Sequence, residues 1–579
     1  MKTPDEGPNG ATLLSRRDWF GKMALPATGA VIAAAMLDGR QAEAKRKPEH
    51  KSEHNPEAIS AESGTKVYNI RDYGAKGDGK TIDTAALQAA IDACNKEGGG
   101  TVLVPSGTFV IGATEVKSNV TLHVAADGTL LGSADGKQYH SIDAIPLTGD
   151  TTLRDGDWAL LFAVKQTNIR IEGPGTLNGQ GAQFRSPQRG VLAPSGLRGP
   201  QRPYFVLLYQ CEDVTVRNIN MINCAFHCIR PIESKRLHME NIYIHSRVNS
   251  NNDGFHFISC EYATVNNCVV LCGDDACAMF GSCRNITITN CFFSTRWSVF
   301  RFGGGHAGNI AVANCVLSIV DGCPFKFQGD PGSRFENISF SDIVLDQVTG
   351  PVSISVGATK SLSGQEFSPV VVRNISFSHI HGTVTTNPAT TLPESDLHVG
   401  LRPGEAHSAI VLNAIHGCVI EDISFSDVHI TFGGGGTAEE GARRDVPEAF
   451  GEYFELGPIP AYGLYARNVK GITLSNVRFQ TATRDLRPAV VLDHVEDLAF
   501  NGFSVQGDLQ AESVVRLIDC KQVLISATRV LTPSPPFLGV EGTGNVNIIV
   551  DGGDLSKAAS LAIFKAGASA DSVKLNNVT

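Results

Sequence analysis

A short pattern that recurs about every 24 residues constrains the fold of this chain more than any other feature. Apolar and polar residues alternate, an Asn or Asp follows, and another apolar pair comes next, as in VTVRNINM, ITITNCFF and ISFSDIVL. Short period-2 strands repeated at this spacing, with turn residues between them, are typical of stacked parallel coils. We therefore predict an all-β fold, a right-handed single-stranded parallel β-helix. The regular copies are centred on Asn218, Asn241, Asn267, Asn290, Asn314 and Asp342.

Weaker copies of the pattern extend it toward the C-terminus. Two of their spacings, 48 and 49 residues, are about twice the period, which predicts a skipped or degenerate coil in each. Residues 383–404 and 433–460 also interrupt the rhythm, and we expect them to be insertions that line one face of the solenoid and close one end of a groove. The weaker copies lie near His379, Asp427, Asn476, Gly502 and Thr528.

Three cysteines, Cys268, Cys291 and Cys315, occupy equivalent positions of the repeat. In a strand that alternates between inside and outside, this predicts an internal ladder of small buried hydrophobes. The chain has 14 Cys but no CxxC pair, so the spacing argues against a zinc site. We expect no cofactor.

Before the coils, residues 84–97 have the apolar spacing of a helix, with Asp83 or Thr84 as its cap and GGG at 98–100 as its end. This helix is predicted to close the open N-terminal end of the tube. The preceding segment, residues 74–81, fits GxxxxGK[ST], the phosphate-binding loop pattern. That mechanism needs helices flanking a parallel sheet, which the later sequence does not provide, so we interpret the segment as a glycine-rich turn.

The N-terminal 64 residues differ from the rest. Residues 1–44 contain SRRDWFGK, an apolar Ala-rich run and AEA, which is typical of a twin-arginine-type signal peptide. Residues 45–64 are polar and predict a disordered tether, which leaves 65–579 for the β-helix. We expect a periplasmic or secreted monomer without a membrane span in its mature form. The net charge of −10 argues against a nucleic-acid partner.

Three carboxylates carry the chemistry that we expect. Asp253 lies in NNDG, and Asp274 and Asp275 follow it by 21 and 22 residues, slightly less than one coil. They should therefore stack on adjacent coils, where mutual repulsion raises at least one pKa and lets a neutral acid coexist with ionised neighbours. This pair of states is what glycosidic-bond hydrolysis needs. A calcium site is the other interpretation, because clustered carboxylates suit hard cations.

The stretches VYNIRDYGAKGDGKTIDTAALQAAIDAC and RPYFVLLYQCEDVTVRNINMINCAFHCIRP, with the NNDGF and GDD motifs, resemble glycoside hydrolase family 28, the polygalacturonase family. The resemblance runs from about residue 66 to at least 345. It implies a pectin lyase-like β-helix and inverting hydrolysis. By position, it implies Asp274 as general acid and Asp253 and Asp275 as the residues that activate water.

Two motifs of that family are altered here. Where a Gly-His-Gly is expected the chain has RWS, so Trp297 replaces the histidine, and the Arg-Ile-Lys motif reads PFK, which keeps only Lys326. Lys326 would bind a substrate carboxylate or hydroxyl, and Arg301 would supply the missing cation. Trp297 is interpreted as either a sugar-stacking platform or ordinary packing.

Further site residues follow from the same motifs. His256 and His306 are possible substitutes for the lost histidine, and Asn251 of NNDG is expected to bind substrate. The loss of the arginine weakens the case for plain polygalacturonate and favours a rhamnogalacturonan-like or otherwise decorated glycan.

The leading hypothesis is an exported, metal-independent glycoside hydrolase that acts on a plant cell-wall or other acidic polysaccharide, of galacturonan or rhamnogalacturonan type. A polysaccharide lyase on the same fold is an alternative, which would need calcium and a base such as Lys326 or Arg301. A non-catalytic glycan-binding β-helix is another, suggested by the altered motifs. The insertions favour exo over endo attack.

Overall fold

A computed structural model describes residues 66–142, 145, 158–187, 191–197, 201–357, 368–388, 402 and 404–579. The predicted signal peptide and tether lie outside these residues. Within the described ranges, no helix has both the length and the apolar character that crossing a membrane requires.

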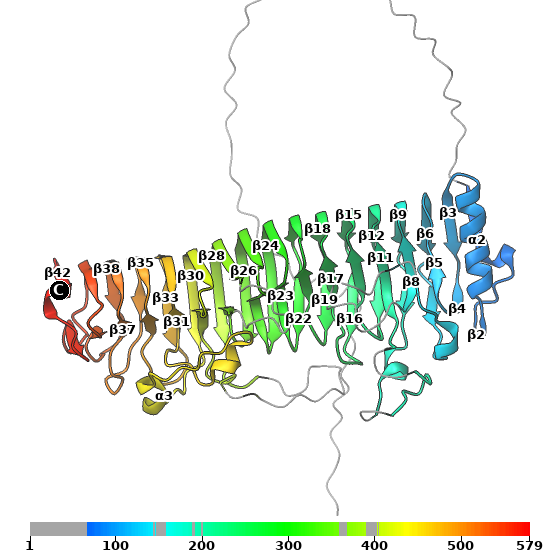
Figure 1. Ribbon diagram of the computed structural model, residues 1–579. Coiled ribbons are helices and arrows are strands. Elements are labelled where there is room, and N and C mark those ends of the chain that lie inside the picture. The colour runs from blue at the N-terminus through cyan, green and yellow to red at the C-terminus, as the bar shows by residue number, and fades with distance from the viewer. Residues whose placement is uncertain are drawn as a thin grey trace, which may run out of the picture. The chain divides into compact units, whose positions relative to one another are not determined.

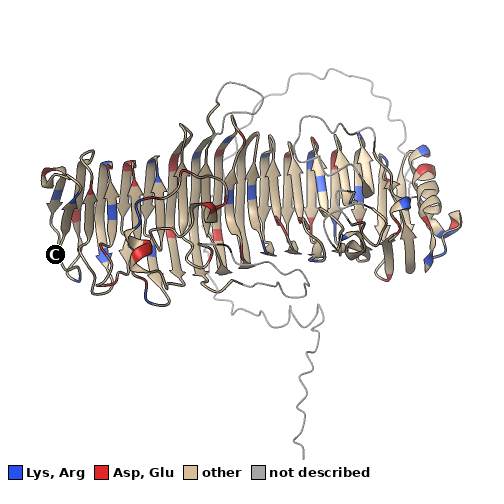
Figure 2. Cartoon of the chain, turned by 60° about the horizontal axis from the view of Figure 1, so that its bottom comes forward, with Lys and Arg blue, Asp and Glu red and all other residues tan. Residues whose placement is uncertain are grey.

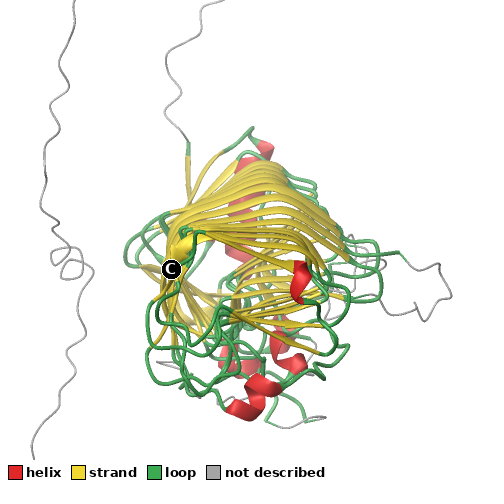
Figure 3. Cartoon of the chain, turned by 90° about the vertical axis from the view of Figure 1, so that its left-hand side faces the viewer, coloured by secondary structure: helices red, strands yellow, loops and turns green. Residues whose placement is uncertain are grey.

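The described strands form two long parallel sheets whose members recur once per coil (Figure 1). The pairing follows the stack. For example, β24 (His306–Val320) pairs with β26 (Arg334–Val348), with Ala311 opposite Ser339, a shift of one coil. Seen along the stack from its C-terminal end, the strands lie over one another, and several loops and short helices gather on one side (Figure 3). The predicted parallel β-helix is confirmed.

The smaller sheet carries the residues discussed below. Its strands are β5 (Thr114–Glu115), β8 (Ala159–Val164), β11 (Tyr204–Tyr209), β14 (Ile229–Ile232), β17 (Phe255–Ile258), β20 (Cys277–Phe280), β23 (Ser298–Gly303), β25 (Cys323–Gln328), β27 (Val352–Val356), β29 (Ile410–Ala414), β31 (Leu464–Arg467), β34 (Val490–Asp493), β37 (Val515–Ile518), β39 (Leu538–Glu541) and β41 (Ala562–Lys565).

The other sheet follows the repeat that the sequence shows. Its central strands are β12 (Glu212–Arg217), β13 (Asn220–Ile222), β15 (Lys235–Glu240), β16 (Tyr243–Ser246), β18 (Glu261–Asn266), β19 (Val269–Cys272), β21 (Arg284–Thr289), β22 (Phe292–Thr295), β24, β26, β28 (Val371–Val384), β30 (Val419–Phe432), β32 (Val469–Ser475) and β33 (Arg478–Thr481).

The Asn or Asp of each repeat turns the chain at a coil corner. Asn218, Asn241, Asn290 and Asp342 all have φ between 50° and 57°, the left-handed region that short polar side chains tolerate best. Neighbouring corners are joined, because the amide of Asn241 donates to Asn218 Oδ1 at 2.8 Å. The recurring Asn therefore reflects a backbone requirement of the corner.

The long spacings have a different cause from the one predicted. β28 pairs directly with β30, with Ser378 opposite Ser426, and β30 pairs directly with β32, with Ser426 opposite Ser475. The predicted skipped coils are wrong: the coils are adjacent, and the extra residues form insertions between them. The last weak copy is also shifted by one residue, since Ala527 rather than Thr528 has the left-handed conformation.

Apolar side chains fill the tube. At each inward-facing position of the repeat, they form a column that runs along the stack of coils. Phe340, Phe377 and Phe425 stack face to face with centroids 5.2 and 5.0 Å apart. All 14 cysteines are buried free thiols. The cysteines at 268, 291 and 315 are among them, which confirms the predicted internal ladder.

The helix α2 (Thr84–Lys96) covers the N-terminal end of the tube, as predicted (Figure 1). It buries Leu87, Ala90, Ile91 and Cys94. Asp83 precedes the helix, but its carboxylate accepts hydrogen bonds from the amides of residues 76 and 77 at 2.7 and 3.0 Å. Those amides are the ones that a phosphate-binding loop would offer to a ligand, so the glycine-rich turn is a structural element.

Candidate active site

Two of the predicted carboxylates, Asp253 and Asp275, lie in one row just before neighbouring strands of the smaller sheet. β17 and β20 pair Phe255 with Cys277, and the amide of Gly254 donates to the carbonyl of Asp275 at 3.0 Å, so Asp253 is aligned with Asp275 on the next coil. The coil before contributes His227, because the amide of the following residue, Cys228, donates to the carbonyl of Asp253 at 2.9 Å. The register thus places an imidazole and two carboxylates on three successive coils.

Asp253 is buried and lies beside two imidazoles. His256 Nδ1 lies 2.7 Å from Asp253 Oδ2, and His227 Nε2 lies 3.5 Å from Oδ1. The two rings are stacked, 4.3 Å apart at an angle of 13°. Burial and the nearby His256 and Arg230 hold the pKa of His227 well below its usual range. Burial and the Asp275 charge raise the pKa of Asp253 well above its usual range, against the opposing effect of Arg230.

Asp274 is the one carboxylate of the three that is partly exposed. Asn251 donates its amide to Asp274 Oδ2 at 3.2 Å, and the backbone amide of Asp275 donates to Oδ1 at 2.9 Å. Desolvation of the Asp274 carboxyl and the charges of Asp253 and Asp275 raise the pKa of Asp274 well above its usual range. A carboxyl in this state can keep its proton at a pH where an ordinary Asp is ionised.

Asp275 is held in a more polar environment. Its Oδ1 accepts a hydrogen bond from the Ser298 amide at 3.3 Å, and its Oδ2 lies 3.6 Å from Arg301 Nε. The site therefore offers two different environments to two adjacent acids.

A second row, three residues further along each strand, carries the basic side chains. Ile229 pairs with Phe255, so Arg230 is aligned with His256, and β20, β23 and β25 continue the row with Ala278, Arg301 and Lys326. Figure 2 shows Lys and Arg positions on several of the parallel strands. The cations lie beside the acids because the register fixes both rows.

Lys326 is buried and paired. Its ammonium contacts Glu452, which comes from the insertion between β30 and β31, and Arg301 Nη1 is 4.0 Å from the same carboxylate oxygen. Burial and the Arg301 charge lower the pKa of Lys326, and Glu452 opposes this shift. Burial acts to lower the pKa of Arg301 as well, but Asp275 and Glu452 raise it above its ordinary value.

Trp297 takes the position where the family has its histidine, and it is partly buried. The Arg402 guanidinium lies 4.0 Å from the centre of the indole ring, and the Lys326 ammonium lies 5.4 Å from it. Phe454 packs edge-on against the same ring at 6.2 Å. These contacts favour packing over a sugar platform as its role.

Four residues of this cluster were not predicted from the sequence. His227 and Arg230 precede Asp253 and His256 by 26 residues, so a step back of one coil finds both. Arg202 donates to Asn251 Oδ1 at 3.0 Å, and Glu452 arrives from an insertion. Neither carries a spacing signal. His306 is exposed on β24, and its proposed role as the substitute histidine is wrong.

One arrangement of donors resembles a metal site. His227, Asp253 and His256 offer ligand atoms within 4.8 Å of one another. Calcium takes six to eight oxygen ligands, whereas this set is mostly imidazole nitrogen, so it does not fit calcium. A transition metal would meet the Arg230 guanidinium, whose Nη1 lies 2.6 Å from His227 Nδ1. The cationic surroundings therefore disfavour any bound cation.

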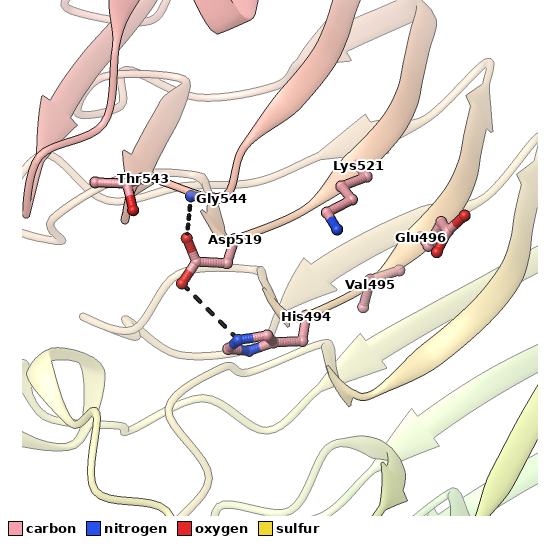
Figure 4. A pocket seen from close by; sticks show the side chains of 7 residues that line it. All are labelled: His494, Val495, Glu496, Asp519, Lys521, Thr543 and Gly544. Atoms are coloured by element: carbon pink, nitrogen blue, oxygen red, sulfur yellow. Dashed lines mark hydrogen bonds and ion pairs between the residues drawn. The ribbon is translucent and has the colours of Figure 1, made fainter.

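A separate surface pocket lies on the C-terminal coils (Figure 4). It is lined by His494, Glu496, Asp519 and Lys521, with Asp519 between the Gly544 amide at 2.6 Å and His494 at 3.9 Å. His494 and Asp519 are corner residues with φ near 50°. The pocket contains none of the residues described above and is a gap between coil corners.

The fold is a parallel β-helix, and its candidate site holds a carboxyl with a raised pKa beside a carboxylate that contacts an arginine. These two features describe a β-helical protein equipped for acid–base catalysis. Residues 94–442 match the glycosyl hydrolases family 28, and the chain belongs to this family. It is therefore a glycoside hydrolase.

The relatives and solved structures agree with this assignment. The chain is 25% identical over 386 residues to an exopolygalacturonase of Platanus acerifolia, covering 65% of this chain and 93% of that protein. It is 31% identical over 222 residues to a probable polygalacturonase of Vitis vinifera, covering 36% of this chain and only 43% of that one. An exopolygalacturonase of Thermotoga maritima superposes with a TM-score of 0.55 at 20% identity, covering 72% and 92% of the two chains. A family 28 exopolygalacturonase of Yersinia enterocolitica superposes with a TM-score of 0.53 at 18% identity, covering 76% and 78%.

Proposed function

We propose that this protein hydrolyses a pectin-type polysaccharide, of galacturonan or rhamnogalacturonan type, by an inverting mechanism. Asp274 is the general acid that protonates the leaving glycosidic oxygen. Asp253 and Asp275 hold and activate the attacking water. The observation that carries the proposal is the contrast between Asp274, partly exposed with a raised pKa, and Asp275, which is buried beside Arg301 and accepts a hydrogen bond from the Ser298 amide.

The environment of Asp253 supports its part in binding water. Its buried Oδ1 accepts no hydrogen bond from the described residues, and such an atom is normally satisfied by water or ligand. The raised pKa of Asp253 makes it a stronger base once it is ionised. The same proximity that raises the pKa values couples the titration of the cluster, so its pH profile belongs to the group of acids.

The lyase alternative receives less support. It needs a basic side chain that is free to take a proton from the carbon next to a uronate carboxylate. Lys326 is buried against Glu452, and Arg301 lies between Asp275 and Glu452. Both candidate bases are occupied by protein carboxylates.

The test is a reducing-end assay over a panel of pectic glycans, with the anomeric configuration of the first product read by NMR. Asp274→Asn should abolish turnover while the folded protein still binds the glycan. Retained activity in this variant, or a product of retained configuration, would refute the proposed mechanism. Ultraviolet absorbance from an unsaturated product would support the lyase.

We further propose that the protein is exported and acts on plant cell-wall material outside the cytoplasm, on the basis of the twin-arginine pattern near its N-terminus.

A further inference from the structure

Glu452 places a carboxylate of the protein where the family resemblance predicts a carboxylate or hydroxyl of the substrate. It precedes the short helix η5 (Tyr453–Leu456) in the insertion between β30 and β31. From there it reaches Lys326, which lies in the middle of β25, two strands before β29 in the same sheet. The pairing joins residues 126 positions apart in the sequence.

The segment that carries Glu452 is fixed on both sides. Tyr453 is 1% exposed and its hydroxyl is 3.0 Å from Thr349 Oγ1. Gly350 has φ 52°, and a Cβ there would lie 2.3 Å from the Tyr453 ring, so this close approach requires glycine. On the other side, the Gly451 amide donates to the Ser355 carbonyl at 3.2 Å. Glu452 is thus held at its position by packing of the segment as well as by its charge.

The charges around Lys326 balance within the protein. Lys326 and Arg301 contribute two positive charges, and Glu452 and Asp275 contribute two negative charges within 4.0 Å of them. Lys326 is fully buried, and a buried cation without a partner is strongly unfavourable. A substrate carboxylate brought to this pair would lie close to the Glu452 carboxylate, and like charges in close contact repel each other.

We propose that Glu452 is a specificity-determining residue that makes the subsite at Lys326 and Arg301 select a sugar without a free carboxylate, either a neutral sugar or an esterified uronate. This inference rests on the proposed function and narrows its substrate class. Arg301 and Glu452, both partly exposed, then serve as a hydrogen-bonding pair for hydroxyl groups, the guanidinium donating and the carboxylate accepting.

The experiment compares wild type, Glu452→Gln and the control Glu455→Gln. Glu455 is exposed and lies three residues further along the same segment. The probes are oligogalacturonides of equal length, as the free acid and as the methyl ester. Affinity is measured by calorimetry in the Asp274→Asn background, and kcat/KM in the active protein. We expect wild type to prefer the ester, and Glu452→Gln to shift the ester-to-acid ratio at least tenfold toward the free acid, with Glu455→Gln unchanged.

A preference of the wild type for the free acid would overturn the inference, whether or not the variant folds. An unchanged ratio in a folded Glu452→Gln would also overturn it, and so would the absence of binding to both probes. If the glycan is hydrolysed but the ester-to-acid ratio is unchanged in Glu452→Gln, only the role of Glu452 is contradicted. A shifted binding ratio without hydrolysis of any glycan supports that role and contradicts the proposed function.

Discussion

His256 is the residue that we propose as the substitute for the family histidine. The family histidine is replaced by Trp297, but His256 contacts Asp253, which lies three residues before it on the same coil. Its ring is stacked between His227 at 4.3 Å and Phe280 at 4.9 Å, so its orientation is fixed. We interpret it as a positioning residue that acts through Asp253.

The variant His256→Phe should keep the stacking and lose the hydrogen bond to Asp253. Without this donor the ionised form of Asp253 loses a stabilising contact, so its pKa rises further. We expect kcat to fall about tenfold or more, since such a bond is worth about 1.5–3 kcal/mol, and the acidic limb of the pH–rate profile to move to higher pH. His306→Phe, on the exposed side of β24, is the control. An unmoved acidic limb would show that His256 serves packing alone.

The raised pKa of Asp274 also makes a prediction about stability. A carboxyl that binds its proton more tightly in the folded than in the unfolded state stabilises the fold most at low pH. This stability falls as the pH rises above about 3.9, the unfolded value, until the raised folded pKa is passed.

Asp274→Asn should therefore be more stable than wild type at pH 8, by about 1.4 kcal/mol for each unit of the shift, and the difference should vanish near pH 4. Denaturant unfolding at both pH values measures it. Asp127→Asn, at an exposed turn position, should show no such trend. A variant that is less stable than wild type at pH 8 would contradict the raised pKa.

At the scale of the element, the coil corner sets the amino-acid choice. Asn290 is exposed and has φ 57°, so its identity matters through its backbone conformation. A β-branched residue is strained at this φ, whereas glycine adopts it freely. We expect Asn290→Val to lower the free energy of unfolding by about 1–2 kcal/mol and Asn290→Gly to change it much less. Urea denaturation of both variants measures this, and equal losses would mean that the side-chain contacts of Asn290 dominate.

The elements also show what sequence patterns can and cannot predict. The period predicted the coils, and one-coil spacing predicted that Asp253 and Asp275 align, because register converts sequence separation into distance. His227 and Arg230 were not predicted as site residues. A basic residue in a buried apolar segment can be recognised as part of a site only when the residue aligned with it on the next coil is known. Glu452 was beyond prediction, since an insertion of irregular length carries no register. The same irregularity led to the mistaken skipped coils.

At the scale of the whole molecule, export is the property that the N-terminal pattern predicts. The twin-arginine route requires both arginines of its motif, which here are Arg16 and Arg17. In a bacterium with this pathway, the double change of both to Lys should leave the protein in the cytoplasmic fraction, while wild type reaches the periplasm or medium. Arg40→Lys, outside the motif, should be exported normally. Export of the double variant would contradict the assignment.

The buried thiols can report where the folded solenoid opens locally. Every one of the 14 cysteines is a buried free thiol, and burial raises the pKa of Cys283 and Cys520 to about 12. Thiolate, the reactive form, is then both scarce and shielded in the folded state. Because coils in a stack contact only their neighbours, local opening exposes the sulfurs of that stretch alone. The order in which a thiol reagent labels the cysteines would map where the solenoid comes apart first.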